Sequence, residues 1–141
     1  MVRVLDGGSE TENMNGNRES EQRMLGDDIA DRLLEFASQA LRIVGRLPNS
    51  REGKHIAGQL VKAGTAGGAH YEEARGAESK ADFAHKVLLA AKEVGEAVYW
   101  IKLARRGGLP QSPDLPSIIG EGKELVAILK ASARTARKRA G

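Results

Sequence analysis

The residues best suited to bind a ligand are lysines and arginines near the C-terminus of the chain. On a helical wheel of residues 115–138, several cations share one strip, and residues 125–141 contain no acidic residue. Such a strip attracts phosphate backbones by releasing counterions, without reading base sequence. We therefore predict nucleic-acid contacts at Lys123, Lys130, Arg134, Arg137, Lys138 and Arg139. The second choice for the same role is Lys102, Arg105 and Arg106, which end the preceding helical segment. The alternative is a solvated C-terminal tail whose cations suit the helix dipole.

Other chemistries find little support among the residue types. The chain has no cysteine, which excludes disulfides, thiolate zinc sites, iron–sulfur clusters and cysteine nucleophiles. Asp82 and His85 have the spacing of half a carboxylate di-metal motif, but a second such motif is missing. Glu93 and Glu96 have no nucleophile or phosphate loop beside them. We therefore expect no catalytic residues, no metal and no cofactor.

The elements that carry these residues are predicted to be helices. From residue 27 onward, apolar residues recur at three- and four-residue spacing in four blocks, and no alternating strand pattern is present. The first block ends before Pro48, the third begins with a capping signal at Ser79, and the third ends at Gly107. We predict an all-α, antiparallel up-down-up-down four-helix bundle with helices at about 27–46, 50–75, 79–106 and 115–138. Residues 1–26 are rich in glycine and polar residues and are predicted to form a disordered tail.

The second helical block contains five glycines, which ordinarily weaken a helix. Each costs up to about 1 kcal/mol relative to alanine in a helix interior. Two interpretations remain open: a close approach of a neighbouring helix, or a helix that is weak or kinked near Gly67 and Gly68. The glycines are Gly53, Gly58, Gly64, Gly67 and Gly68.

The third block has a second apolar surface on the side away from its core stripe. An exposed apolar patch with Trp and Tyr is typical of an interface, so we predict a homo-oligomer. The alternative is that the N-terminal tail or a wider bundle core covers these residues. The predicted interface consists of Leu88, Leu89, Tyr99, Trp100 and Leu103. The chain shows no secretory signal and no bilayer-spanning segment, so we expect a cytoplasmic protein.

Three stretches, EARGAESKADFAHK, AAKEVGEAVYWIKLARRGGL and GEGKELVAILKASARTARKR, resemble the small bacterial four helix bundle proteins. These are also called the large-subunit ribosomal RNA intervening-sequence proteins. The resemblance covers about residues 29–139. It departs from the family's Asn-x-x-Glu-Gly ending of the second helix, where this chain has His70 and Ala74 beside a matching Glu73.

The resemblance implies a homopentameric ring without enzymatic activity. Relatives include accessory proteins of diversity-generating retroelements, which bind nucleic acid and a reverse transcriptase. Two functions are therefore expected: an oligomer that binds RNA or DNA backbones without sequence readout, or a protein-interaction scaffold, for example for a reverse transcriptase.

Overall fold

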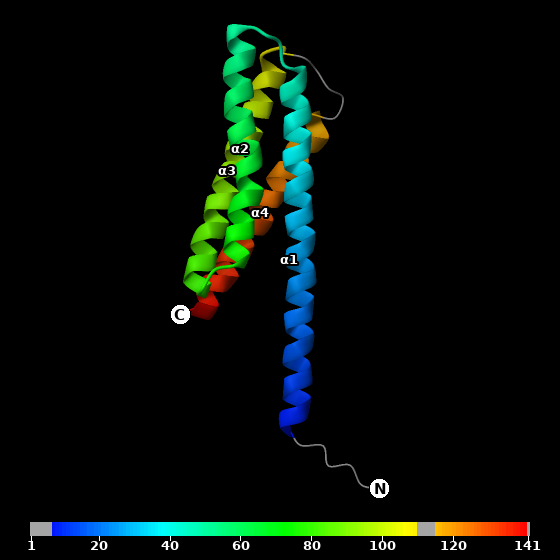
Figure 1. Cartoon of the computed structure of the whole chain (residues 1–141), viewed down its shortest axis with the longest axis vertical. Helices are drawn as coiled ribbons and strands as arrows, with labels where there is room; N and C mark the ends of the chain where they lie inside the picture. The colour runs from blue at the N-terminus through cyan, green and yellow to red at the C-terminus, as the bar shows by residue number, and fades with distance from the viewer. Residues whose placement is uncertain (1–6, 110–114, 141) are drawn as a thin grey trace.

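The computed structural model describes residues 7–109 and 115–140, and its regular elements are four helices. They are α1 (Gly7–Arg46), α2 (Arg51–Arg75), α3 (Lys80–Arg106) and α4 (Leu115–Ala140). Successive helices run in opposite directions, as Figure 1 shows, and no strand occurs within the described residues. The predicted all-α antiparallel four-helix bundle is confirmed.

Helix ends follow the local signals in the sequence. The hydroxyl oxygen Oγ of Ser50 accepts a hydrogen bond from the backbone N–H of Gly53 at 3.0 Å, and Oγ of Ser79 accepts one from Asp82 at 3.0 Å. Each bond satisfies a donor that the first turn of the helix leaves free. At the end of α3, Gly107 is the C-cap and Gly108 adopts a positive φ of 75°, which glycine adopts without strain. The predicted ends of the second and third helices agree with these positions to within one residue.

The first helix is longer than the sequence predicts. Residues 7–26, expected to be disordered, continue α1 as helix, and residues 1–6 lie outside the described residues. Extending an existing helix avoids the cost of nucleation, and the segment contains Glu, Gln, Arg and Met, which favour helix. Residues 13–25 are exposed, and from residue 13 onward Ile29 is the first buried residue of α1. The predicted boundary at residue 27 therefore marks the point where α1 joins the bundle.

The core is built from the predicted helical stripes. Its largest fully buried side chains are Leu33, Phe36, Leu60, Val87, Val94, Ile101, Leu115, Leu125 and Leu129. They come from all four helices, so each helix contributes one apolar stripe to a single cluster.

The glycines of α2 allow its neighbours to approach closely. A Cβ on Gly67 would lie 2.6 Å from Cγ2 of Val94 on α3, and a Cβ on Gly64 would lie 2.7 Å from Cβ of Ala40 on α1. Helix α2 continues through these positions without a break. The close-approach interpretation is therefore confirmed at Gly64 and Gly67, whereas Gly58 faces open space.

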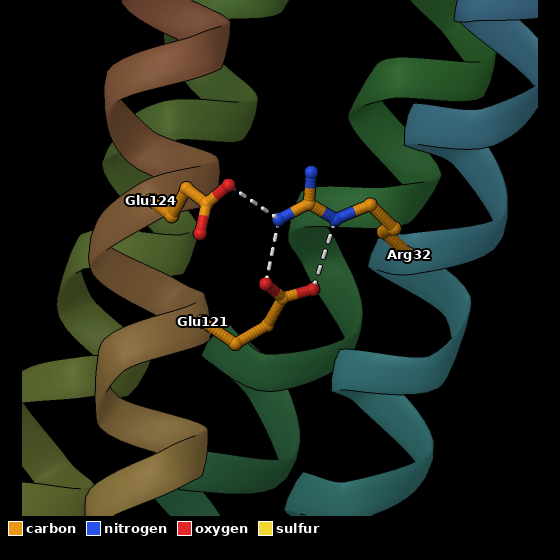
Figure 2. Close-up of polar contacts among 3 residues, drawn as sticks. All are labelled: Arg32, Glu121 and Glu124. Atoms are coloured by element: carbon orange, nitrogen blue, oxygen red, sulfur yellow. Dashed lines mark hydrogen bonds and ion pairs between the residues drawn. The ribbon is translucent and has the colours of Figure 1, made fainter.

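The seam between α1 and α4 carries an ion-pair cluster. Figure 2 shows the guanidinium of Arg32 on α1 meeting two carboxylates of α4. Arg32 Nε donates to Glu121 Oε2 at 3.0 Å and Nη2 to Glu121 Oε1 at 2.6 Å, while Nη2 lies 3.2 Å from Glu124 Oε1. The hydrogen bonds from Arg32 lower the pKa of Glu121 below its ordinary value. This flank of α4 is therefore electrostatically tied to α1.

Candidate nucleic-acid interface

The predicted basic strip lies on the flank of α4 that faces away from α1. All of its members are exposed, and five of them share one strip of the helix: Lys123, Lys130, Arg134, Arg137 and Lys138. Arg139 lies about 150° around the helix from the centre of this strip. The structure thus brings five of the six predicted cations of α4 to one face and leaves Arg139 out.

At the C-terminal end of α4 the strip borders a groove against α3. The groove has a volume of about 460 Å³ and is lined by Leu88, Lys130, Ala133, Arg134, Arg137 and Lys138. Leu88 is half-buried and packs against the core, and Ala133 is buried, so together they form an apolar floor. The cations stand along its rim. Leu88, predicted to be an interface residue, therefore belongs to the basic groove.

At the other end of the strip, cations of α3 join those of α4. The positive charge of Lys123 and a contact with its side chain lower the pKa of Lys102, with a smaller effect from Arg106. These two residues of α3 therefore extend the strip across the seam between α3 and α4. Arg105 lies about 60° from Lys102 and about 100° from Arg106 around α3, and it is not among the causes of the lowered pKa of Lys102.

Lys92 is a further cation of α3, and it is not among the residues that line the groove. It is exposed and stands one turn after Leu88 on the same side of α3. Its relation to the strip depends on which flank of α3 faces α4, and a helical wheel of one helix does not give this. We define the basic face as Lys102, Arg106, Lys123, Lys130, Arg134, Arg137 and Lys138.

The basic face is unbalanced by negative charge. Among the side chains of residues 13–109 and 115–140, the ion pairs involve Arg32, Arg42, His70, Arg75 and Lys86 on the cationic side, and none involves the basic face. Like charges held together without carboxylates repel one another, and an anion that binds there relieves this repulsion. The arrangement is suited to a polyanion.

The remaining predicted interface residues form an aromatic surface on α3. Tyr99 and Leu103 are 55% and 39% exposed, while Leu89 and Trp100 are half-buried. The Trp100 ring is 5.0 Å from the Tyr99 ring and 5.6 Å from the His55 ring of α2, each in an edge-to-face arrangement. Trp100 also packs against the core.

A second apolar surface spans α1 and α2. Leu34, Leu41 and Val61 are exposed there. The sequence pattern indicated the two leucines more weakly than the α3 surface, and Val61 lies on the neighbouring helix. The bundle thus presents apolar surface on two sides.

Other candidate sites have structural explanations. Asp82 forms an ion pair with Lys86 at 3.2 Å, and no group of three or more His, Asp or Glu side chains within the described residues could hold a metal ion. A second groove of about 350 Å³, between α1 and α4, is lined by Glu35, Phe36, Gln39, Ser117, Glu121 and Glu124, and its negative charge is unsuited to phosphate. In the part of the chain that the structure describes, no helix is long and apolar enough to cross a membrane.

Comparison with known proteins places the bundle in a family. The family model of the 23S rRNA-intervening sequence protein matches residues 28–131. A crystal structure from Bacteroides thetaiotaomicron VPI-5482, described as a protein with unknown function from the S23 ribosomal protein family, matches with 31% identity and a TM-score of 0.67. The match covers 73% of this chain and 95% of that chain. No curated protein matches significantly. The chain belongs to the 23S rRNA-intervening sequence protein family.

Proposed function

We propose that this protein is a non-enzymatic nucleic-acid-binding protein that works as a homo-oligomer. The observation that carries the proposal is the basic face, where cations from α3 and α4 gather without any carboxylate partner among the described residues. RNA and DNA backbones are the abundant polyanions that such a face attracts.

The composition of α3 and α4 favours contacts to the backbone over reading of bases. Neither helix contains Asn or Gln, the side chains that pair with adenine edges. Lys123 and Lys138 are separated by fifteen residues of helix, about 22 Å, which is more than half a turn of duplex. The basic face can therefore contact several successive phosphates without specifying a sequence.

The proposed assembly is a homopentameric ring that uses the outward surface of α3. Tyr99 and Leu103 expose apolar area beside the half-buried Trp100 and Leu89, and exposed aromatic residues are enriched at protein interfaces. A ring would bring several copies of the basic face into one field and raise affinity for a long polyanion.

Binding is tested by fluorescence anisotropy with labelled RNA and DNA of unrelated sequences. We expect measurable affinity at about 50 mM salt for every sequence, falling steeply between about 50 and 200 mM. Affinity that is absent at about 50 mM, or that does not change with salt, would overturn the proposal.

Assembly is tested by light scattering on Leu103→Glu. A charge at an exposed interface position should dissociate the oligomer without unfolding the chain. Leu34→Glu, on the apolar surface of α1, is the matched control and should leave the mass unchanged. Dissociation by Leu34→Glu and an unchanged mass of Leu103→Glu would instead assign the interface to α1 and α2.

The alternative function is a scaffold for a partner protein such as a reverse transcriptase. The apolar floor of Leu88 and Ala133 favours it, because a phosphate backbone gains nothing from contact with apolar side chains. An apolar side chain on a partner's helix would be buried there. Recovery of one protein in a pull-down that resists nuclease treatment, together with absent nucleic-acid binding, would favour the scaffold.

A further inference from the structure

The N-terminal part of α1 presents an acidic and apolar stripe of exposed side chains. Figure 1 shows α1 extending well past the other three helices. We call residues 13–28 the arm; apart from the half-buried Gly26, its residues are exposed, including Met24 and Leu25 at 72% and 61%. On the helical wheel one stripe about 100° wide contains no cation, and Arg18 lies about 20° beyond its edge. The stripe consists of Met14, Asn17, Glu21, Met24, Leu25 and Asp28.

The spacing of the stripe matches that of the basic groove. Glu21 and Asp28 are seven residues apart, two helical turns or about 10.5 Å, and so are Lys130 and Arg137 on the rim of the groove. Leu25 lies between the two carboxylates, as Ala133 lies between the two cations, with Leu88 beside it. A helix laid along the groove can therefore pair both charges while an apolar side chain covers the apolar floor.

The groove opens on the flank of α4 that faces away from α1, the helix that carries the arm. Arg75 of α2 forms an ion pair with Asp27, which fixes the point where α1 leaves the other helices. The groove opens between α3 and α4, and α1 is one continuous helix through this point. A straight arm is therefore available to a neighbouring molecule.

We propose that the arm of one copy docks in the α3–α4 groove of a second copy, with Glu21 and Asp28 against Lys130 and Arg137 and with Leu25 on Leu88. Docking covers the cations at one end of the basic face and leaves Lys102, Arg106 and Lys123 exposed. The arm therefore competes with nucleic acid for part of the face. Only this competition rests on the proposed function, since docking itself needs no nucleic acid.

Docking is tested by cross-linking, which the absence of native cysteine makes specific. Leu25→Cys and Leu88→Cys chains are mixed without nucleic acid and treated with a short bismaleimide. We expect a cross-linked heterodimer in the mixture, and at least about fivefold less product when Leu34→Cys replaces Leu25→Cys, because Leu34 is exposed on α1 outside the stripe. Equal yields, or no product, would overturn the proposal. A chain that carries both cysteines is tested alone. An intramolecular cross-link in it would show that the groove binds the arm of its own chain, and this too would overturn the proposal.

A pair of matched variants tests the role of charge. Glu21→Lys and Glu19→Lys change the net charge equally, but the two positions lie about 160° apart around the arm. We expect Glu21→Lys, made in the Leu25→Cys chain, to reduce the cross-linking yield at least about threefold, and Glu19→Lys to leave it unchanged. Reversing both pairs, with Glu21→Lys and Asp28→Lys in the Leu25→Cys chain and Lys130→Glu and Arg137→Glu in the Leu88→Cys chain, should restore the yield. Equal effects of the two lysine variants would contradict the assigned stripe.

Competition is measured separately by anisotropy. With wild-type groove residues, Glu21→Lys should raise nucleic-acid affinity about threefold more than Glu19→Lys does, because only the former releases the groove. If the cross-link forms but nucleic acid binds neither variant, the proposed function fails while docking stands. If nucleic acid binds and no cross-link forms, docking alone fails.

Discussion

The two flanks of α4 carry opposite charges, and only one of them pairs its charges within the fold. On the flank toward α1, Glu121 and Glu124 meet the guanidinium of Arg32 in a bidentate cluster. On the flank toward α3, Lys123 and the cations after it have no carboxylate partner within the described residues, and Lys123 approaches Lys102 closely enough to lower the pKa of Lys102. One flank satisfies its charges inside the fold, whereas the other leaves them to the solvent or to a ligand.

This difference separates charges that hold the bundle together from charges that do not. The paired flank stabilises the α1–α4 seam by a modest amount, since the side chains of Arg32 and Glu121 are 26% and 31% exposed and that of Glu124 is 63% exposed. The unpaired flank opposes folding slightly through repulsion. Substitutions on the two flanks should therefore have opposite consequences for stability and unequal consequences for binding.

The largest expected effect is on nucleic-acid affinity when the unpaired flank is reversed. The triple variant Lys130→Glu, Arg134→Glu, Arg137→Glu should lose at least about 100-fold in affinity at about 50 mM salt, because each substitution removes a phosphate contact and adds repulsion. The control reverses Arg42, Arg51 and Lys54, exposed cations off the face, and changes net charge by the same amount. Anisotropy titrations compare the two. Similar losses in both would show that net charge, and not the face, determines binding.

Packing between the flanks should affect stability alone. A Cβ at Gly122, which lies on α4 between the flanks, would clash with Cγ2 of Val98 and lie 3.0 Å from Cε2 of Phe36. We expect Gly122→Ala to lower the free energy of unfolding by about 1–3 kcal/mol in urea denaturation. Gly120→Ala, two residues earlier, meets no atom within 4 Å and should be neutral or stabilising by up to about 1 kcal/mol. Binding by the folded fraction of either variant should not change, and a loss at Gly122→Ala in the folded state would link packing to the site.

The features predicted correctly from sequence are those set by local rules. Ser50, Ser79 and Gly107 mark helix ends because capping depends on residues a few positions apart. The core stripes follow from the 3.6-residue period of each helix. The start of α1 was predicted twenty residues too late, since the glycines and polar residues before residue 27 suggest disorder while the helix formers among them allow continuation.

Only the part of the site that lies on a single helix could be predicted from the sequence. The strip on α4 could be read from its own wheel, but the position of Leu88 beside it depends on how α3 is rotated against α4. The pairing of Arg32 with Glu121 joins residues 89 positions apart, and no periodicity within either helix indicates it. Contacts between helices are set by the summed packing of both, so their register is not encoded in any single segment.

A smaller effect is expected on the paired flank. Arg32→Ala should lower the free energy of unfolding by about 1 kcal/mol at pH 7, and Arg42→Ala, in an exposed pair with Glu35 at 3.5 Å, by less than about 0.5 kcal/mol. Arg32 holds the pKa of Glu121 below its ordinary value of 4.5. The contribution is therefore present above pH 4.5 and disappears as the pH falls through the lowered pKa. Denaturation curves of wild type and Arg32→Ala at several pH values should converge in acid, and a constant difference would show that packing of the Arg32 stem is responsible.

The smallest expected effect is at the two lysines that approach each other across α3 and α4. Lys123 lowers the pKa of Lys102 by placing a second positive charge beside it, so Lys123→Ala should return that pKa toward its ordinary value of 10.5. A lowered pKa in the folded state means that the charged form of Lys102 is less stable there than in the unfolded chain. This lowers the free energy of unfolding at neutral pH, and the loss decreases as the pH rises through the pKa of the folded state. Lys123→Ala should therefore raise the stability slightly at pH 7 while lowering nucleic-acid affinity. NMR titration of the Lys102 side chain measures the first change and anisotropy the second. An unchanged pKa would place the two amines apart in solution, whereas a raised pKa with unchanged affinity would confine the nucleic acid to the other end of the basic face.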